Sequence, residues 1–148
     1  MQSAPNDVGC LYGRALALGL EAKEHPTRAP SLLNDMLASL EQADAVDPSY
    51  DNAGPARVRA LVLIRAPGWP LGPGDPERGL AAAERAAALR PAYPPNLLAF
   101  AEAQAKHGSA AAARASYARA RDAASNLPGN ADQAEWLREA ERRLSSAP

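Results

Sequence analysis

The sequence has little cysteine: Cys10 is the only one in 148 residues. A single thiol cannot form an internal disulfide, and it cannot build a zinc site that needs several cysteines. No His and Asn pattern that would activate a nucleophilic cysteine is evident, so we expect Cys10 to be a small buried residue of a helix. The cysteine count leaves the redox compartment open.

Long hydrophobic runs are also absent. No window approaches the roughly 18 consecutive apolar residues that a membrane span requires, so we expect no direct membrane span. Residues 1–7 lack the basic and apolar regions of a signal peptide, and we therefore do not expect a lipidation site at Cys10. As written, the chain is expected to be cytoplasmic; it would be periplasmic if an upstream signal had been removed.

Neither sign of charge is in excess, because 16 Lys and Arg face 17 Asp and Glu and the formal net charge is -1. A balanced chain produces no field that would draw it onto nucleic acid or an anionic membrane. We therefore expect no nucleic-acid partner.

Motifs for catalysis are missing as well. The two imidazoles, His25 and His107, fall in a loop and near a helix end, and no metal-spaced His and Glu pair, Gly-rich phosphate loop or nucleophile elbow is present. The carboxylates fall on helix surfaces, where they are usually solvated or paired with arginine. We expect no enzyme activity, no cofactor and no metal site.

Apolar residues at helical spacing, interrupted by Pro, Gly and Asn, predict an all-α single domain over residues 1–148. Three antiparallel helix pairs are expected at about 7–46, 52–90 and 94–124, followed by a capping helix at about 131–144. In the helix that begins near residue 52 we expect a core stripe of Val58, Leu61, Val62 and Ile64. Asp75 before Pro76 predicts the start of the next helix.

A repeat of 34 residues relates the second half of the chain to itself. The distance is 34 residues from Gly79 to Ala113, from Ala83 to Tyr117 and from Ala86 to Ala120. The turn prolines Pro48 and Pro91 lie 43 residues apart, and the nine extra residues fall in a loop around Trp69. A helical period of 34 residues is typical of tetratricopeptide repeats.

Within residues 94–124 the chain resembles the tetratricopeptide repeat (TPR) family. Leu97 and Phe100 match the large residues early in the first helix, and Ala101, Ala113 and Ala120 match the small residues where paired helices cross. The resemblance implies a right-handed TPR-like superhelix, in which the first helix of each pair lines a concave binding face.

A narrower resemblance covers about residues 47–124. The segments 47–50, 54–57, 66–70 and 91–94, together with Asn96, look like the T component family of bacterial tripartite ATP-independent periplasmic (TRAP) transporters. This resemblance implies a periplasmic or lipid-anchored component that partners a solute-binding protein and has a pore or groove for an apolar ligand.

The first helix of each pair supplies the expected partner contacts. On this face we expect exposed polar side chains from two helices, namely Asn52, Arg57, Arg59, Asn96, Glu102 and Lys106. Arg59 and Glu102 fall at about equivalent positions with opposite charges, which argues against a groove that grips a terminal carboxylate.

Two tryptophans each leave two interpretations open. Trp69 lies in a Pro- and Gly-rich loop, and we favour an arrangement in which it folds back with Leu71 to fill a gap between helix pairs. The alternative is a projecting contact for a partner. Trp136 either packs on the preceding helix or belongs to a self-association face.

These observations predict a non-catalytic adaptor that holds a protein or peptide on its concave face, with homo-oligomerisation through the terminal helix as a further expectation. The alternative is a TRAP-transporter-associated ligand-binding component of the periplasm. The identity of the partner is not encoded in any motif.

Overall fold

Residues 6–146, which the computed structural model of the chain describes, form α-helices joined by turns and loops. This part of the chain contains no strand, and the all-α prediction is confirmed. Its seven helices are α1 (Val8–Glu24), α2 (Ala29–Val46), α3 (Tyr50–Arg65), α4 (Pro76–Leu89), α5 (Pro94–Lys106), α6 (Ala110–Ser125) and α7 (Gln133–Ser145).

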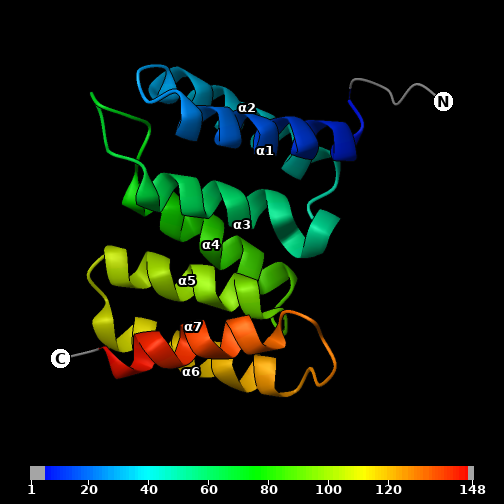
Figure 1. Cartoon of the computed structure of the whole chain (residues 1–148), viewed down its shortest axis with the longest axis vertical. Helices are drawn as coiled ribbons and strands as arrows, with labels where there is room; N and C mark the ends of the chain where they lie inside the picture. Colours follow the sequence, from blue (N-terminus) through cyan, green and yellow to red (C-terminus); the bar gives the residue numbers. More distant parts are fainter. Residues whose placement is uncertain (1–5, 147–148) are drawn as a thin grey trace.

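Neighbouring helices pack in pairs, and the pairs are stacked along the long axis of the molecule (Figure 1). The most extensive contacts join α1 to α2, α3 to α4 and α5 to α6, while α7 packs mainly on α6. Further contacts of α2 with α3, and of α3 and α4 with α5, connect one pair to the next. The expected three pairs and terminal helix are therefore present.

Small residues allow the paired helices to approach closely. Ala83 and Ala86 of α4 are fully buried, and Ala113 and Ala120 of α6 are 3% and 1% exposed. Gly79 is closer still, since a Cβ atom at this position would lie 2.5 Å from Cγ2 of Ile64. The residues of the 34-residue repeat are thus the residues at which helices cross.

The buried face of α3 differs from the expected one. Ala56, Ala60, Leu63 and Ile64 are buried, whereas Val58, Leu61 and Val62 are only half-buried, because α4 covers the alanine-rich side of the helix. Of the predicted core stripe, Ile64 is buried, while Val58, Leu61 and Val62 are partly buried residues that pack against the core. The other three residues form a wall of an open hollow described below.

Cys10 was also misplaced by the sequence analysis. Its thiol is exposed at the start of α1, where the buried stripe is formed instead by Leu11, Ala15 and Ala22. Asp7 caps this helix, because its carboxylate accepts hydrogen bonds from the backbone N–H groups of Gly9 and Cys10.

The loop between α3 and α4 projects from the stack (Figure 1). Trp69 and Leu71 are 90% and 71% exposed, so the expectation that they fold back between helix pairs is wrong. The loop is closed at its base by backbone hydrogen bonds, from Gly74 N to Pro67 O and from Asp75 N to Leu63 O, each 2.8 Å. Because these bonds close the loop on itself, Trp69 and Leu71 stay at its exposed end.

The Gly79 contact leads to a stability prediction. We expect Gly79→Ala to lower the free energy of unfolding by about 1–3 kcal/mol, because Ile64 must move, although alanine favours a helix over glycine. Gly13→Ala is the matched control: nothing lies within 4 Å of its Cβ position, so it should stabilise by about 0.5–1 kcal/mol. Urea denaturation followed by circular dichroism measures both values. Equal stabilisation by both variants would contradict the close-packing argument.

Candidate functional site

The beginning of α3 contains three consecutive residues in the left-handed backbone region. Asp51, Asn52 and Ala53 have φ values of 49°, 55° and 65°. Asp and Asn tolerate this conformation better than most residues, but it costs roughly 1–2 kcal/mol per L-residue. The turn therefore persists only because the surrounding structure stabilises it.

Arg57 supplies much of that stabilisation. Its guanidinium donates to the backbone oxygens of Asp51 and Asn52, at 3.2 and 3.1 Å from Nη1, and forms a 3.0 Å ion pair with the Asp51 carboxylate. It also donates a 3.0 Å hydrogen bond to Oδ1 of Asn96. The rigid, planar donor set of an arginine suits this group of acceptors, which a single lysine ammonium could not reach together.

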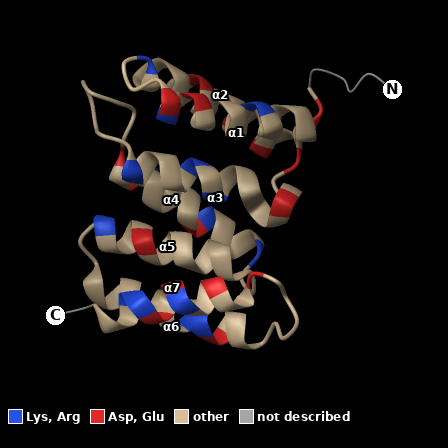
Figure 2. Cartoon of the chain, viewed as in Figure 1, with Lys and Arg blue, Asp and Glu red and all other residues tan. Residues whose placement is uncertain are grey.

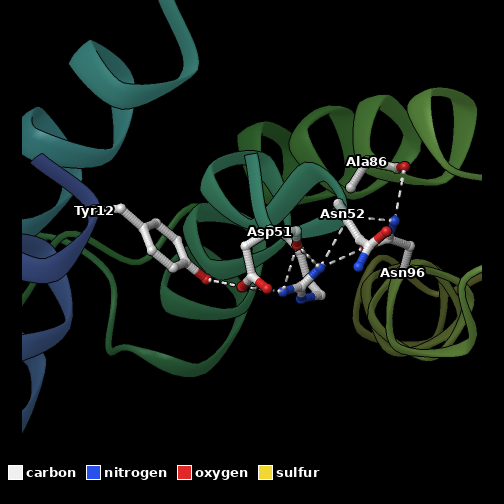
Figure 3. Close-up of polar contacts among 6 residues, drawn as sticks. Tyr12, Asp51, Asn52, Ala86 and Asn96 are labelled. Atoms are coloured by element: carbon white, nitrogen blue, oxygen red, sulfur yellow. Dashed lines mark hydrogen bonds and ion pairs between the residues drawn. The ribbon is translucent and has the colours of Figure 1, made fainter. Parts of the chain in front are cut away.

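Asn96 connects the same turn to the neighbouring helices. Its Nδ2 donates to the backbone oxygens of Asn52 at 2.9 Å and of Ala86, in the last turn of α4, at 3.1 Å (Figure 3). From the other side, the phenol of Tyr12 in α1 donates a 2.7 Å hydrogen bond to Oδ2 of Asp51. Burial, reinforced by the hydrogen bond to Asp51, raises the pKa of the Tyr12 phenol above its ordinary value.

This network, from Tyr12 through Asp51 and Arg57 to Asn96, corrects two predictions. Asn96 is fully buried and Arg57 is 9% exposed, so neither is an exposed contact for a partner. The structure does bring together Asn52, Arg57 and Asn96. Arg57 and Asn96 both donate hydrogen bonds to the backbone oxygen of Asn52, and Arg57 also donates to the side chain of Asn96.

Aromatic contacts extend the network to the C-terminal helix. The Arg57 guanidinium lies 5.2 Å from the centre of the Tyr93 ring, within cation–π range. Tyr93 in turn packs edge to face against Trp136 of α7, with 5.7 Å between ring centres. Trp136 thus packs on the turn before α5.

A hollow of about 530 Å³ lies between α3, α5 and α7, and we call it the charged groove. The apolar part of its wall is formed by Leu61, Leu98 and Trp136. An ion pair crosses it, because Arg65 of α3 donates hydrogen bonds of 2.8 and 2.7 Å to the two carboxylate oxygens of Glu102 in α5. The charged side chains of the lining are Arg57, Arg65, Glu102, Glu135, Arg138, Glu139 and Arg142.

Glu139 is the centre of the ionic contacts on α7. It accepts hydrogen bonds from Arg142 and from Arg143, and the Arg143 guanidinium lies 6.0 Å from the ring centre of Tyr117 in α6. Partial burial opposes ionisation of Glu139, but the hydrogen bonds and charges of the two arginines outweigh it and hold its pKa below the ordinary glutamate value. The contact between Arg143 and Tyr117 connects α7 to α6.

A second hollow, of about 610 Å³, lies between α1, α2 and α3, and we call it the apolar trough. Leu16 and Leu20 form its rim and are 41% and 63% exposed. Leu61 and Arg65 line both hollows, so the apolar trough and the charged groove adjoin at these two residues, and we call the two hollows together the furrow. Along the helices, Lys and Arg are interspersed with Asp and Glu (Figure 2).

Of the remaining predicted residues, only one lines a hollow. Glu102 lines the charged groove, while Asn52, Arg59 and Lys106 line neither hollow. Sequence reasoning missed the roles of Tyr12, Asp51, Tyr93 and Arg65, whereas the pairing of Glu139 with nearby arginines follows from helical spacing. Tyr12 and Arg57 each lie 39 positions from the residue that they contact, so no local pattern identifies these pairs.

No known family model matches the chain, and no curated protein matches its sequence significantly. Over residues 6–146, no helix is long and apolar enough to cross a membrane. Within the same range, no group of three or more His, Cys, Asp and Glu residues is arranged to hold a metal ion.

The network makes Arg57 a stability determinant. We expect Arg57→Met to lower the free energy of unfolding by roughly 3 kcal/mol, because Asn96 and two backbone oxygens lose a buried charged donor. Arg59→Met, two residues along α3, is the control: Arg59 makes no side-chain hydrogen bond or ion pair within residues 6–146, so the change should stay within about 0.5 kcal/mol. Urea denaturation gives both values, and similar losses for the two variants would refute the assignment.

Glu139 leads to a pH prediction. Because its pKa is lower in the folded chain than in the unfolded one, its ionised form stabilises the fold above the ordinary glutamate pKa, and this contribution is lost as pH falls through the lower, folded value. Its side chain is 33% exposed, so we expect a loss of only about 0.5 kcal/mol. Glu139→Gln should remove this part of the pH dependence and Glu141→Gln, on the same helix, should not. Unfolding curves at a series of acidic pH values compare the variants.

Proposed function

We propose that this chain is a non-catalytic adaptor, a short TPR-like solenoid that holds a polypeptide segment of a partner protein in the furrow. The observation that carries the proposal is that the two hollows adjoin at Leu61 and Arg65 on one helix. The 34-residue repeat and the stacked helix pairs support a TPR-like superhelix, whose alternate helices α1, α3, α5 and α7 would form the binding face.

The chemistry of the furrow supports a polypeptide over a small polar ligand. One half is apolar and the other carries arginines and glutamates, so a segment with an apolar part and a charged part is complementary along its length. In this proposal Glu102 and Arg65 contact the partner, while Arg57 and Asn96 support the walls. Trp69, on its projecting loop, is an additional contact candidate outside the furrow.

A second candidate function is a TRAP-transporter-associated component of the periplasm. The observation that favours it is the apolar trough, whose volume of about 610 Å³ is in the range of small-molecule sites. The candidates differ in their partner, because only the second requires a solute-binding protein that co-purifies with the full-length gene product. Absence of such a protein from the purified complex would remove the second candidate.

The adaptor proposal is tested with peptides selected from a random display library on the immobilised chain. We expect the selected peptides to bind the double variant Arg65→Glu with Glu102→Arg at least about tenfold more weakly than the wild type, because the variant keeps the ion pair but reverses the charges that a ligand meets. Fluorescence anisotropy measures the affinities.

Lys106→Glu is the matched control, since it also reverses a charge on α5 but lies outside both hollows. Its affinities should equal those of the wild type. The proposal fails if the double variant binds as tightly as the wild type, or if chemical-shift mapping places the peptides on α2, α4 and α6.

A further inference from the structure

One wall of the apolar trough is a stripe on α1. It consists of Leu16, Gly19, Leu20 and Lys23, which are offset by 0, 3, 4 and 7 positions and therefore lie on one side of the helix. Gly19 lies close against α2, because a Cβ atom at this position would lie only 3.0 Å from Sδ of Met36. The two leucines stand on the rim with much of their surface in solvent.

The opposite wall has the same spacing. It consists of Val58, Leu61, Val62 and Arg65 of α3, again offset by 0, 3, 4 and 7 positions. α1 and α3 run in the same direction across the molecule (Figure 1). They are joined near their beginnings by the hydrogen bond from Tyr12 to Asp51, and the trough extends from there towards their ends.

Two parallel stripes of this spacing form the surface against which a third helix packs. A helix with apolar residues at the same offsets can insert them between the side chains of both walls, as in bundles with interlocking side chains. An extended peptide presents its side chains alternately to opposite sides and would fill such a surface poorly. The trough is about two helical turns long, which suits a short helical segment.

The charges of the trough are complementary to an acidic ligand. The only charged residues that line it are the cations Lys23 and Arg65, and both lie at the end where α1 and α3 finish. Arg65 is paired with Glu102, whereas Lys23 makes no ion pair within residues 6–146. The C-terminal ends of α1 and α3 also carry partial negative charge, which attracts the N-terminus of another helix.

We propose that the apolar trough binds one amphipathic helix of a partner protein, antiparallel to α1 and α3, with an acidic residue in its first turn beside Lys23. This inference rests on the proposed adaptor function and names the class of segment that its apolar half recognises. The partner is a different protein from this chain, because the exposed leucines Leu16 and Leu20 lie on α1, and α1 has no acidic residue in its first turn that a second copy could place beside Lys23.

The probe is a synthetic, fluorescently labelled peptide of about 16 residues, long enough to reach helical structure on binding. It carries leucines at offsets 0, 3, 4 and 7, glutamates in its first turn and blocked ends. A second peptide has lysines in place of the glutamates, and a third has the same composition with the leucines off one face. We expect the first peptide to bind most tightly and to gain helical circular dichroism on binding.

Variants of the trough give the decisive comparison. Leu20→Glu should weaken the first peptide by at least about tenfold, because it places a charge where a leucine is buried by the ligand. Val46→Glu is the matched control, since Val46 is 53% exposed on α2 and lies outside the trough. Lys23→Glu should reverse the preference between the glutamate and lysine peptides. All three substituted positions are exposed, so thermal unfolding should be unchanged.

The inference is overturned if the off-face peptide binds as well as the first, if Leu20→Glu and Val46→Glu act alike, or if Lys23→Glu leaves the preference unchanged. It is also overturned if the chain dimerises through the trough, so that Leu20→Glu releases monomers without affecting the peptide. Failure of the probe while library-selected peptides still bind the charged groove refutes only this inference. Failure of both sets of peptides refutes the adaptor function as well.

Discussion

The structure depends on one interaction above all: the guanidinium of Arg57 binding the left-handed turn at the start of its own helix. The turn costs free energy, and Pro55, four residues after Asp51, has no N–H to donate to the Asp51 backbone oxygen. Arg57 and Asn96 donate hydrogen bonds to the backbone oxygens of the turn. The Asp51 carboxylate forms an ion pair with Arg57 and accepts a hydrogen bond from Tyr12. Because these residues come from α1, α3 and α5, a local turn fixes how the three helix pairs sit relative to one another.

The position of this network explains why the apolar trough is open. It joins α1 to α3 near their beginnings, and no comparable polar contact joins their ends within residues 6–146. The helices are therefore held together on one side of the stack and leave the apolar trough open on the other. The side chain of Arg65, which makes a bidentate contact with Glu102, lies at the boundary between the trough and the charged groove and lines both. Neighbouring residues on α3 thus contribute both to the polar network and to the walls of the two hollows.

Much of the fold could be predicted from local signals. Proline, glycine and capping residues mark helix ends through backbone geometry alone, as at Asp75 and Gly108, and helical spacing marked the remaining helices. The candidate site was less predictable. Arg57 and Asn96 are polar residues on helices, a pattern usually typical of solvent exposure, yet both are buried because their partners come from distant parts of the chain. Trp69 was misjudged for the opposite reason, since backbone hydrogen bonds close its loop without burying the indole.

By itself, the sequence determined the all-α class, the positions of the helices and the small residues at which pairs cross, because each depends on residues close together in the chain. Only the tertiary structure decided which face of α3 is covered and which polar residues bind one another. Val58, Leu61 and Val62 have the spacing of a core stripe, and periodicity cannot distinguish a face buried by a neighbour from a face left open. That choice depends on where α4 packs, and it leaves these three residues in the wall of the apolar trough.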